Sequence, residues 1–133
     1  MTAAKLTLAN GLDSRTGAIG KAPVLDEEHL SRMTLGDRHL EREVLQIYVR
    51  QSAIMLGRMA SGDPARVAAA AHTLNGSARG IGAWRVAKAA EHLEQASNAG
   101  HEPTLSEALT ELKAASLEAG AAVAARLDDP SAR

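Results

Sequence analysis

The sequence predicts an all-α protein, an antiparallel up-and-down four-helix bundle with a short leading helix. Its 133 residues include no Phe, one Trp and one Tyr, whereas β-strands usually depend on aromatic and β-branched residues. Alanine, leucine, glutamate and arginine, all good helix formers, are frequent. Apolar residues recur at helical spacing and no convincing segment alternates with a period of two, so the pattern favours helices over strands.

The first two helices of the predicted bundle both begin at an aspartate. Asp26 is the expected N-cap of the short leading helix, and Leu25 can pack against Leu30 as a hydrophobic staple. Asp37 is predicted to start a second, longer helix that reaches about Ala60. The apolar residues of this helix form a broad face, which favours contact with more than one neighbour: Leu40, Val44, Ile47, Tyr48, Met55 and Met59.

A third helix is predicted to begin at Asp63 and Pro64 and to end near Gly80. Aspartate is a favoured N-cap, and proline is tolerated at the first helical position because the N–H that it lacks would have no partner there. Apolar residues at helical spacing give this helix a single stripe that is expected to face the core: Val67, Ala71, Leu74, Ala78 and Ile81.

Two further helices complete the predicted bundle. The fourth, at about residues 83–97, follows a tight connection and is therefore expected to run antiparallel to the third. The fifth is predicted to begin at the capping box of residues 104–107 and to continue to Asp128. The predicted organisation is a flexible N-terminal extension, a bundle and a C-terminal tail, at residues 1–22, 23–127 and 128–133.

Charge and composition exclude several functional classes. The formal net charge of −1 at pH 7 argues against nucleic acid as the main partner, which would favour a basic surface. The absence of cysteine excludes disulfides and thiolate metal sites, and no Glu-x-x-His repeat indicates a metal site in the bundle. No segment has the pattern of a secretory signal or the roughly 18–20 apolar residues that span a bilayer. We therefore expect a monomeric, cytoplasmic protein that contacts neither membrane nor nucleic acid.

His72 occupies an unusual face of the third helix. At about 100° per residue it lies roughly 140° from the middle of the apolar stripe, so it is expected to face solvent. Solvated helix faces usually carry long polar side chains, whereas the neighbours of His72 on this face are small: Ala65, Ala68, Ala69 and Gly76. Because a glycine inside a helix costs about 0.5–1 kcal/mol relative to alanine, this pattern predicts a docking surface with a nucleophile at its centre.

The residues around His72 resemble the motif of histidine phosphotransfer (HPt) domains of bacterial phosphorelays. The matching positions are small, aliphatic or glycine residues near the histidine, a glycine ten positions after it and a closing Leu-Glu: Ala71, His72, Leu74, Gly76, Ser77, Ala78, Gly82, Ala83, Val86, Leu93 and Glu94. The resemblance extends from about Leu25 to the last helix. Asn75 departs from it, because the family usually has lysine at this position.

The resemblance implies that His72 is the phosphorylation site. A neutral imidazole has one ring nitrogen free to attack, and the resulting phosphoramidate is labile enough to pass the group on to an aspartate. An acidic or amide residue at the position of Glu94 contacts the histidine in the family. Glu94 is therefore predicted to hold the tautomer of His72, and the alternative is a solvated residue at the edge of the helix stripe.

Two residues are candidates for contacts to the phosphoryl group. Asn75 can donate a hydrogen bond to it but adds no positive charge. Arg79 lies two turns from His72 along the same line, and it either supplies the missing charge and a partner contact or is an ordinary surface arginine. Trp84 is interpreted as packing against the loop or the N-terminal extension rather than against a partner. The remaining histidines have ordinary polar neighbours and are interpreted as surface residues: His29, His39, His92 and His101.

The function implied by the resemblance is that of a stand-alone phosphotransfer protein in a multistep two-component phosphorelay. A phosphoryl group would pass between His72 and aspartates of response-regulator receiver domains, and a hybrid histidine kinase would supply it. The chain has no GxxxxGK[ST] loop, so it is not predicted to be a kinase, and it is expected to bind no cofactor. Mg²⁺ is expected on the partner receiver domain. The departure at Asn75 leaves one alternative open, a non-catalytic adaptor on the same fold that binds receiver domains without carrying phosphate.

Overall fold

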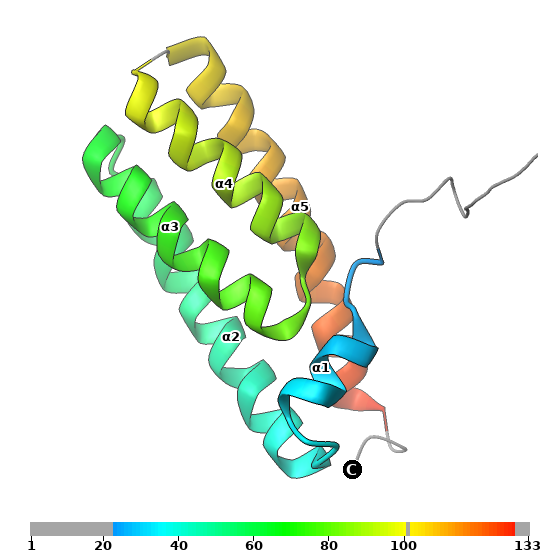
Figure 1. Cartoon of the computed structure of the whole chain (residues 1–133). Coiled ribbons are helices and arrows are strands. Elements are labelled where there is room, and N and C mark those ends of the chain that lie inside the picture. Colours follow the sequence, from blue (N-terminus) through cyan, green and yellow to red (C-terminus); the bar gives the residue numbers. More distant parts are fainter. Residues whose placement is uncertain (1–22, 101, 130–133) are drawn as a thin grey trace, which may run out of the picture.

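The computed structural model describes residues 23–100 and 102–129, which contain five α-helices and no strand. The helices are α1 Glu27–Met33, α2 Arg38–Met59, α3 Pro64–Ile81, α4 Trp84–Ala99 and α5 Glu102–Asp128. Figure 1 shows α2, α3, α4 and α5 side by side with alternating direction, while the short α1 packs at one end of the bundle. This arrangement confirms the predicted fold class, and the predicted extension of residues 1–22 lies outside the described residues. None of the helices in the described ranges is long and apolar enough to cross a membrane.

Aspartate N-caps begin three of the helices at the predicted places. The carboxylates of Asp26, Asp37 and Asp63 each accept a hydrogen bond from a backbone N–H in the first turn, over 3.1, 3.1 and 3.3 Å. These bonds satisfy N–H groups that have no partner inside the helix. The sequence locates these starts correctly because the capping interaction is local.

The start of α5 differs from the prediction. The helix begins at Glu102, so the capping box of residues 104–107 lies inside the helix and Thr104 is not its N-cap. Pro103 lies in the first turn instead of in the preceding loop. Proline is compatible with this place because the first N–H groups of a helix have no intrahelical acceptor and its fixed φ is helical.

The buried face of α2 is narrower than the sequence predicts. Leu45, Tyr48 and Met55 are buried, whereas Leu40 and Ile47 leave 36% and 49% of their surface exposed. α2 packs mainly against α3 and α5, and those two helices determine which of its side chains lie in the core. The predicted apolar face therefore includes residues that remain accessible at the surface.

Alanine is abundant where α3 and α4 meet. Ala71 and Ala78 on α3 and Ala90 on α4 are completely buried. Small side chains let two helix axes approach each other closely, and the contact between α3 and α4 is the most extensive in the bundle. Larger side chains complete the core from all five helices, among them Leu30, Leu45, Leu74, Val86, Leu93, Leu112 and Val123.

The turn between α3 and α4 is held by the start of α1. Trp84 donates a hydrogen bond from Nε1 to Asp26 over 2.9 Å, and this bond is the main reason why the pKa of Asp26 is lowered. The backbone N–H of Asp26 donates to the carbonyl of Gly82 over 3.0 Å. Gly82 has a φ of +80°, and a Cβ there would lie 2.9 Å from the Asp26 side chain. The tight turn therefore requires glycine, and Trp84 packs against the leading helix.

An ion pair joins α2 to α5. The guanidinium of Arg126 donates to both carboxylate oxygens of Glu41, over 2.7 and 3.1 Å, and Glu41 is buried. Glu27 of α1 lies 3.5 Å from the same guanidinium. The bond to Glu41 raises the pKa of Arg126 above its ordinary value, so the guanidinium is charged throughout the physiological pH range. The ion pair between Glu41 and Arg126 therefore holds α2 against α5, the first and last of the four long helices.

Candidate functional site

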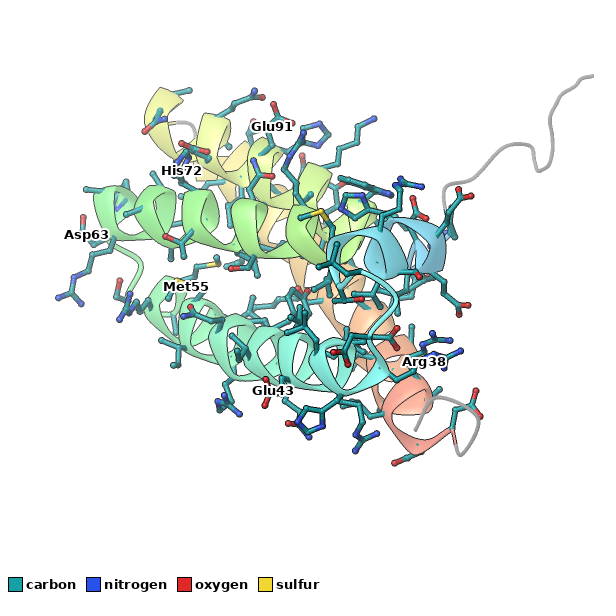
Figure 2. All side chains as sticks on the ribbon, turned by 60° about the horizontal axis from the view of Figure 1, so that its bottom comes forward. Arg38, Glu43, Met55, Asp63, His72 and Glu91 are labelled. Carbon is teal, nitrogen blue, oxygen red and sulfur yellow. The ribbon has the colours of Figure 1, made fainter. Side chains whose placement is uncertain are left out.

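His72 lies in the middle of α3 and projects away from the core. Its side chain is 75% exposed, although the adjacent Ala71 is fully buried. In Figure 2 the imidazole stands on the outer side of α3, away from Met55 of α2. The predicted exposure of His72 is therefore confirmed, and the ring is open to an approaching partner.

Glu94 reaches His72 from the neighbouring helix. It lies on α4, and its two carboxylate oxygens are 3.2 and 3.3 Å from Nδ1 of His72. The Glu94 side chain is only 27% exposed, which limits how far it can turn away. The structure thus brings together two residues that are 22 positions apart in the sequence.

This contact determines which imidazole nitrogen is free. An ionised carboxylate only accepts hydrogen bonds, so Nδ1 of His72 carries the hydrogen that it donates to Glu94. In a neutral imidazole the other nitrogen, Nε2, then has an unprotonated lone pair. The arrangement can therefore present Nε2 as a nucleophile on an exposed helix face.

Asn75 is half-buried one turn after His72, at the position where the family motif usually has lysine. Its Oδ1 atom is buried and has no hydrogen-bond partner among the described residues. The side chain adds no positive charge near His72. A hydrogen bond from Asn75 to a phosphoryl group remains a prediction.

Arg79 lies near the end of α3, where its guanidinium carbon is 5.8 Å from the ring centre of Trp84. A cation over an aromatic face is attracted by the ring quadrupole. The Arg79 carbonyl oxygen is also 2.9 Å from Nε2 of His29 on α1. These contacts place Arg79 beside the turn between α3 and α4. Its predicted contact with a phosphoryl group on His72 requires the side chain to reach back along α3, and it stays a prediction.

The small residues predicted to line the docking surface lie as expected on the His72 face. Ala65, Ala69 and Gly76 are exposed, and Ala68 is half-buried. A Cβ added to Gly76 would meet no atom within 4 Å, so nothing inside the protein requires glycine there. Gly120 on α5 has the same open surroundings, so openness alone does not identify a docking surface. The distinguishing property of Gly76 is its position, one helical turn from His72.

The comparison with protein families agrees with this geometry. The Hpt domain family matches the chain over residues 43–129, which include all of α3, α4 and α5 and all of α2 except residues 38–42. The chain belongs to the Hpt domain family. Comparisons with curated proteins and with solved structures found no match. Membership implies histidine phosphotransfer in a phosphorelay and interaction with receiver domains and kinases.

Two hollows lie beside the exposed face of this Hpt domain, both between α2 and α3. One has a volume of about 280 Å³ and is mainly apolar, with Met33, Ile47 and Gly76 in its lining. The second has a volume of about 400 Å³ and is lined by Arg58, Arg66, Ala69, Ala70 and Thr73. These hollows were not predicted from the sequence, although apolar residues on α2 and arginines on adjacent helices were available as signals.

The other histidines of the described residues have different surroundings. His29 packs on Trp84, with ring centres 4.8 Å apart, and so belongs to the α1 contact. His39 lies 3.6 Å from Glu43, one turn along the same helix. His92 is 3.5 Å from Glu111 of α5 and is the nearest counterpart of His72. His101 lies outside the described residues.

No group of three or more His, Cys, Asp or Glu side chains within residues 23–100 and 102–129 is arranged to hold a metal ion. The candidate site of this Hpt domain thus consists of one exposed imidazole, one carboxylate behind it and a surrounding surface of small residues. These groups are suited to accepting and releasing a group that a partner presents.

Proposed function

We propose that this Hpt domain carries a phosphoryl group on Nε2 of His72 and passes it between aspartates of receiver domains in a multistep two-component phosphorelay. The observation that carries the proposal is the contact of Glu94 with Nδ1, over 3.2 Å, beneath a largely exposed imidazole. Family membership supports the phosphotransfer chemistry, and the geometry supports His72 as the residue that performs it.

In the forward step, the lone pair of Nε2 attacks the phosphorus of an aspartyl phosphate on the receiver domain. The Nε2–P bond forms as the P–O bond to the aspartate breaks, and the aspartate leaves as a carboxylate. His72 keeps its proton on Nδ1, so the phosphorylated ring is cationic until that proton moves. The carboxylate of Glu94 accepts the Nδ1–H bond and stabilises this positive charge. In the second transfer the carboxylate of another aspartate attacks the phosphorus, so that a P–O bond forms, the Nε2–P bond breaks and the imidazole leaves in its neutral form.

The partner is proposed to supply the groups that the Hpt domain lacks. A phosphoryl group in transfer carries negative charge spread over its oxygens, and this charge is usually neutralised by cations in the site. The Hpt domain places Asn75 rather than a cation one turn from His72. We expect Mg²⁺ and the acceptor aspartate to be on the receiver domain, and a hybrid histidine kinase to act upstream. That this module acts as a separate, monomeric cytoplasmic protein also remains a prediction.

The alternative is an adaptor that binds receiver domains without carrying phosphate. The absence of a cation at Asn75 favours this reading, because lysine is usual there. The contact between His72 and Glu94 opposes it, because an adaptor has no need of a fixed imidazole tautomer. Both functions use the same docking face, so only chemistry distinguishes them.

The test is to incubate the purified chain with receiver domains that carry a labelled aspartyl phosphate. We expect the label to move to the chain and to be lost in acid but retained in alkali, as a phosphoramidate requires. Binding of a phosphorylated receiver domain without transfer of the label would favour the adaptor. A label that survives acid would indicate a hydroxyl group as the acceptor and would contradict the proposal.

A further inference from the structure

The surface formed by α2 and α3 carries an excess of positive charge. From Val44 to Ile81 the sequence contains four arginines and a single acidic residue, Asp63. The Asp63 carboxylate is already used as the N-cap of α3. The whole chain has a net charge of −1, so this segment differs in sign from the rest of the protein.

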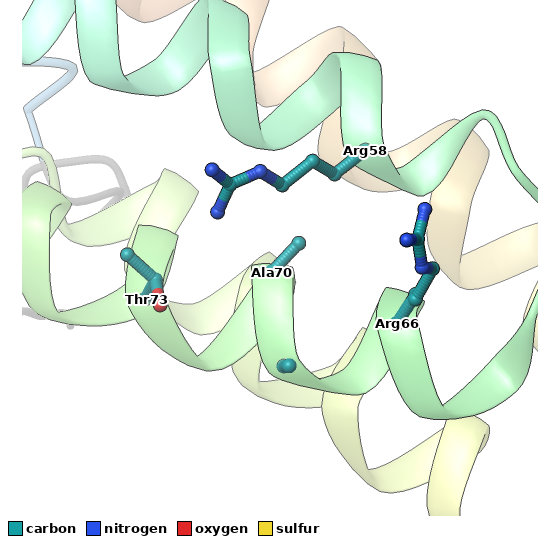
Figure 3. A pocket seen from close by; sticks show the side chains of 5 residues that line it. Arg58, Arg66, Ala70 and Thr73 are labelled. Atoms are coloured by element: carbon teal, nitrogen blue, oxygen red, sulfur yellow. The ribbon is translucent and has the colours of Figure 1, made fainter.

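Two of these arginines, Arg58 of α2 and Arg66 of α3, line the same hollow from facing helices. The hollow has a volume of about 400 Å³, and Thr73, the residue after His72, forms part of its lining. Figure 3 shows both guanidinium groups at the hollow, with Arg58 extended along it toward Thr73. The positive charges therefore lie on the α2 side of His72, opposite the α4 side from which Glu94 approaches.

Within the described part of the chain, no carboxylate pairs with Arg58 or Arg66. The only hydrogen bond of the Arg58 side chain to the described residues is a weak one, with Nη1 4.0 Å from the sulfur of Met55. Elsewhere arginines do pair: Arg85 lies 2.7 Å from Glu118, and Arg126 lies 2.7 Å from Glu41. Two like charges at one hollow repel each other, so the arrangement becomes favourable when an anion binds between them.

The chemistry of the partner identifies the anion. A receiver domain that accepts a phosphoryl group on aspartate and holds Mg²⁺ must concentrate carboxylates around its acceptor, because Mg²⁺ prefers oxygen ligands. Guanidinium groups match carboxylates with two parallel hydrogen bonds. A phosphoryl group on His72 is a less suitable ligand for Arg66, which lies six residues away, or about 9 Å along the helix axis.

We propose that Arg58 and Arg66 form a carboxylate-binding site that holds the acidic rim of the docked receiver domain and directs its acceptor aspartate toward His72. The identity of the partner rests on the proposed function. The arginines act as positioning residues, because they touch the partner at a distance from the reacting atoms. Their contribution is electrostatic and at the surface, so it falls as salt is added.

The experiment compares the double variant R58Q/R66Q with R50Q. Arg50 is an exposed arginine of α2 that does not line the hollow, so R50Q is a control for loss of charge on the same helix. The dissociation constant for an unphosphorylated receiver domain is measured for each protein at low and high salt. We expect R58Q/R66Q to weaken binding about tenfold at low salt and about twofold or less at high salt. R50Q is expected to change binding by less than about twofold at either salt concentration.

The outcomes separate this inference from the proposed function. If a receiver domain transfers its phosphoryl group but its affinity is the same for R58Q/R66Q and wild type, the inference fails and the function stands. If both arginine variants weaken binding equally, general charge explains the effect and the inference also fails. An arginine-dependent affinity without transfer would support the inference and refute the phosphotransfer function. If no receiver domain binds the chain, both are overturned. Unchanged thermal unfolding of R58Q/R66Q confirms that the variant is folded.

Discussion

His72 and His92 each place Nδ1 close to a glutamate of the next helix, at 3.2 Å for Glu94 and 3.5 Å for Glu111. Their surroundings differ. His72 is 75% exposed on a face of small residues, whereas His92 is 45% exposed beside a hollow that Gln95, Glu107 and Glu111 line together with smaller residues. The hollow at His92 contains both Glu107 and Glu111 and no cation, and the hollow beside the His72 face contains two arginines.

This difference shows that a histidine–carboxylate pair is not sufficient to mark a phosphotransfer site. A phosphoryl group brings negative charge, so the two glutamates beside His92 would repel it. At His72 both the charge and the shape of the surface favour an acidic partner. The residues around each histidine–carboxylate pair therefore distinguish the site at His72 from the site at His92. Each of the following variants tests one difference between the two sites.

The largest expected effect comes from removing the nucleophile. His72→Gln should abolish labelling by a phosphorylated receiver domain, while His92→Gln should be labelled as wild type. Both side chains are exposed, so each change should alter the free energy of unfolding by about 0.5 kcal/mol or less. Acid-labile label on His72→Gln would place the phosphorylation site on another histidine and would remove the basis of the comparison.

The second effect tests the two carboxylates. Glu94→Ala should slow phosphoryl uptake by about 10- to 100-fold, at or below the low end of what a positioned acid–base partner contributes, because Glu94 only orients the nucleophile. Receiver affinity should not change, since Glu94 is largely covered. Glu111→Ala is the matched control and should leave the rate of uptake unchanged. Uptake at the wild-type rate in Glu94→Ala would return Glu94 to the role of a solvated residue at the edge of the helix stripe.

The third effect concerns the small residues of the docking face. Gly76→Gln should weaken receiver binding about tenfold, because a long side chain would occupy the surface where the partner approaches. It should also stabilise the isolated domain by up to about 1 kcal/mol through helix propensity. Gly120→Gln on α5 provides the same gain in propensity and should leave receiver binding unchanged. Equal affinities of the two variants, measured by titration, would show that the face around Gly76 is not an interface.

The smallest effect is expected at Arg79 and Asn75. If Arg79 supplies the charge that lysine usually provides, Arg79→Ala should slow transfer about two- to fivefold, the range for an exposed charge. Its guanidinium lies over Trp84, which is why we expect less than for Glu94. Asn75→Lys should restore the rate in the Arg79→Ala background, because either cation would serve. A wild-type rate for Arg79→Ala, measured at fixed salt, would eliminate the idea of charge replacement.

The sequence predicted the features that depend on neighbouring residues. Aspartate caps located three helix starts, and helical spacing placed His72 on the exposed side of α3. The contact of Glu94 with His72 was predicted from the resemblance to the family. The structure shows its physical basis: the tight turn at Gly82 makes α3 and α4 antiparallel, so the two residues lie opposite each other.

Features that depend on how helices rotate against one another were missed. The pairing of Glu41 with Arg126 spans 85 residues, and no local pattern indicates it. The exposure of Ile47 and the hollow between Arg58 and Arg66 likewise depend on which face of α2 turns toward α3. A broad apolar face is compatible with several rotations, and packing with all neighbours selects one of them.

The attachment of α1 to the turn between α3 and α4 has a consequence for where the folding unit begins. The family match starts at residue 43, within α2, but Leu30 is completely buried and Asp26 bonds to Trp84. A fragment cut at residue 43 would also lack Glu41 and would leave Arg126 without its partner. Loss of one large core side chain alone typically costs about 2–5 kcal/mol, a large part of the stability of a small domain. The smallest piece that can be transplanted into another protein with its histidine in place therefore starts before Leu25, about 18 residues upstream of the point where the family match begins.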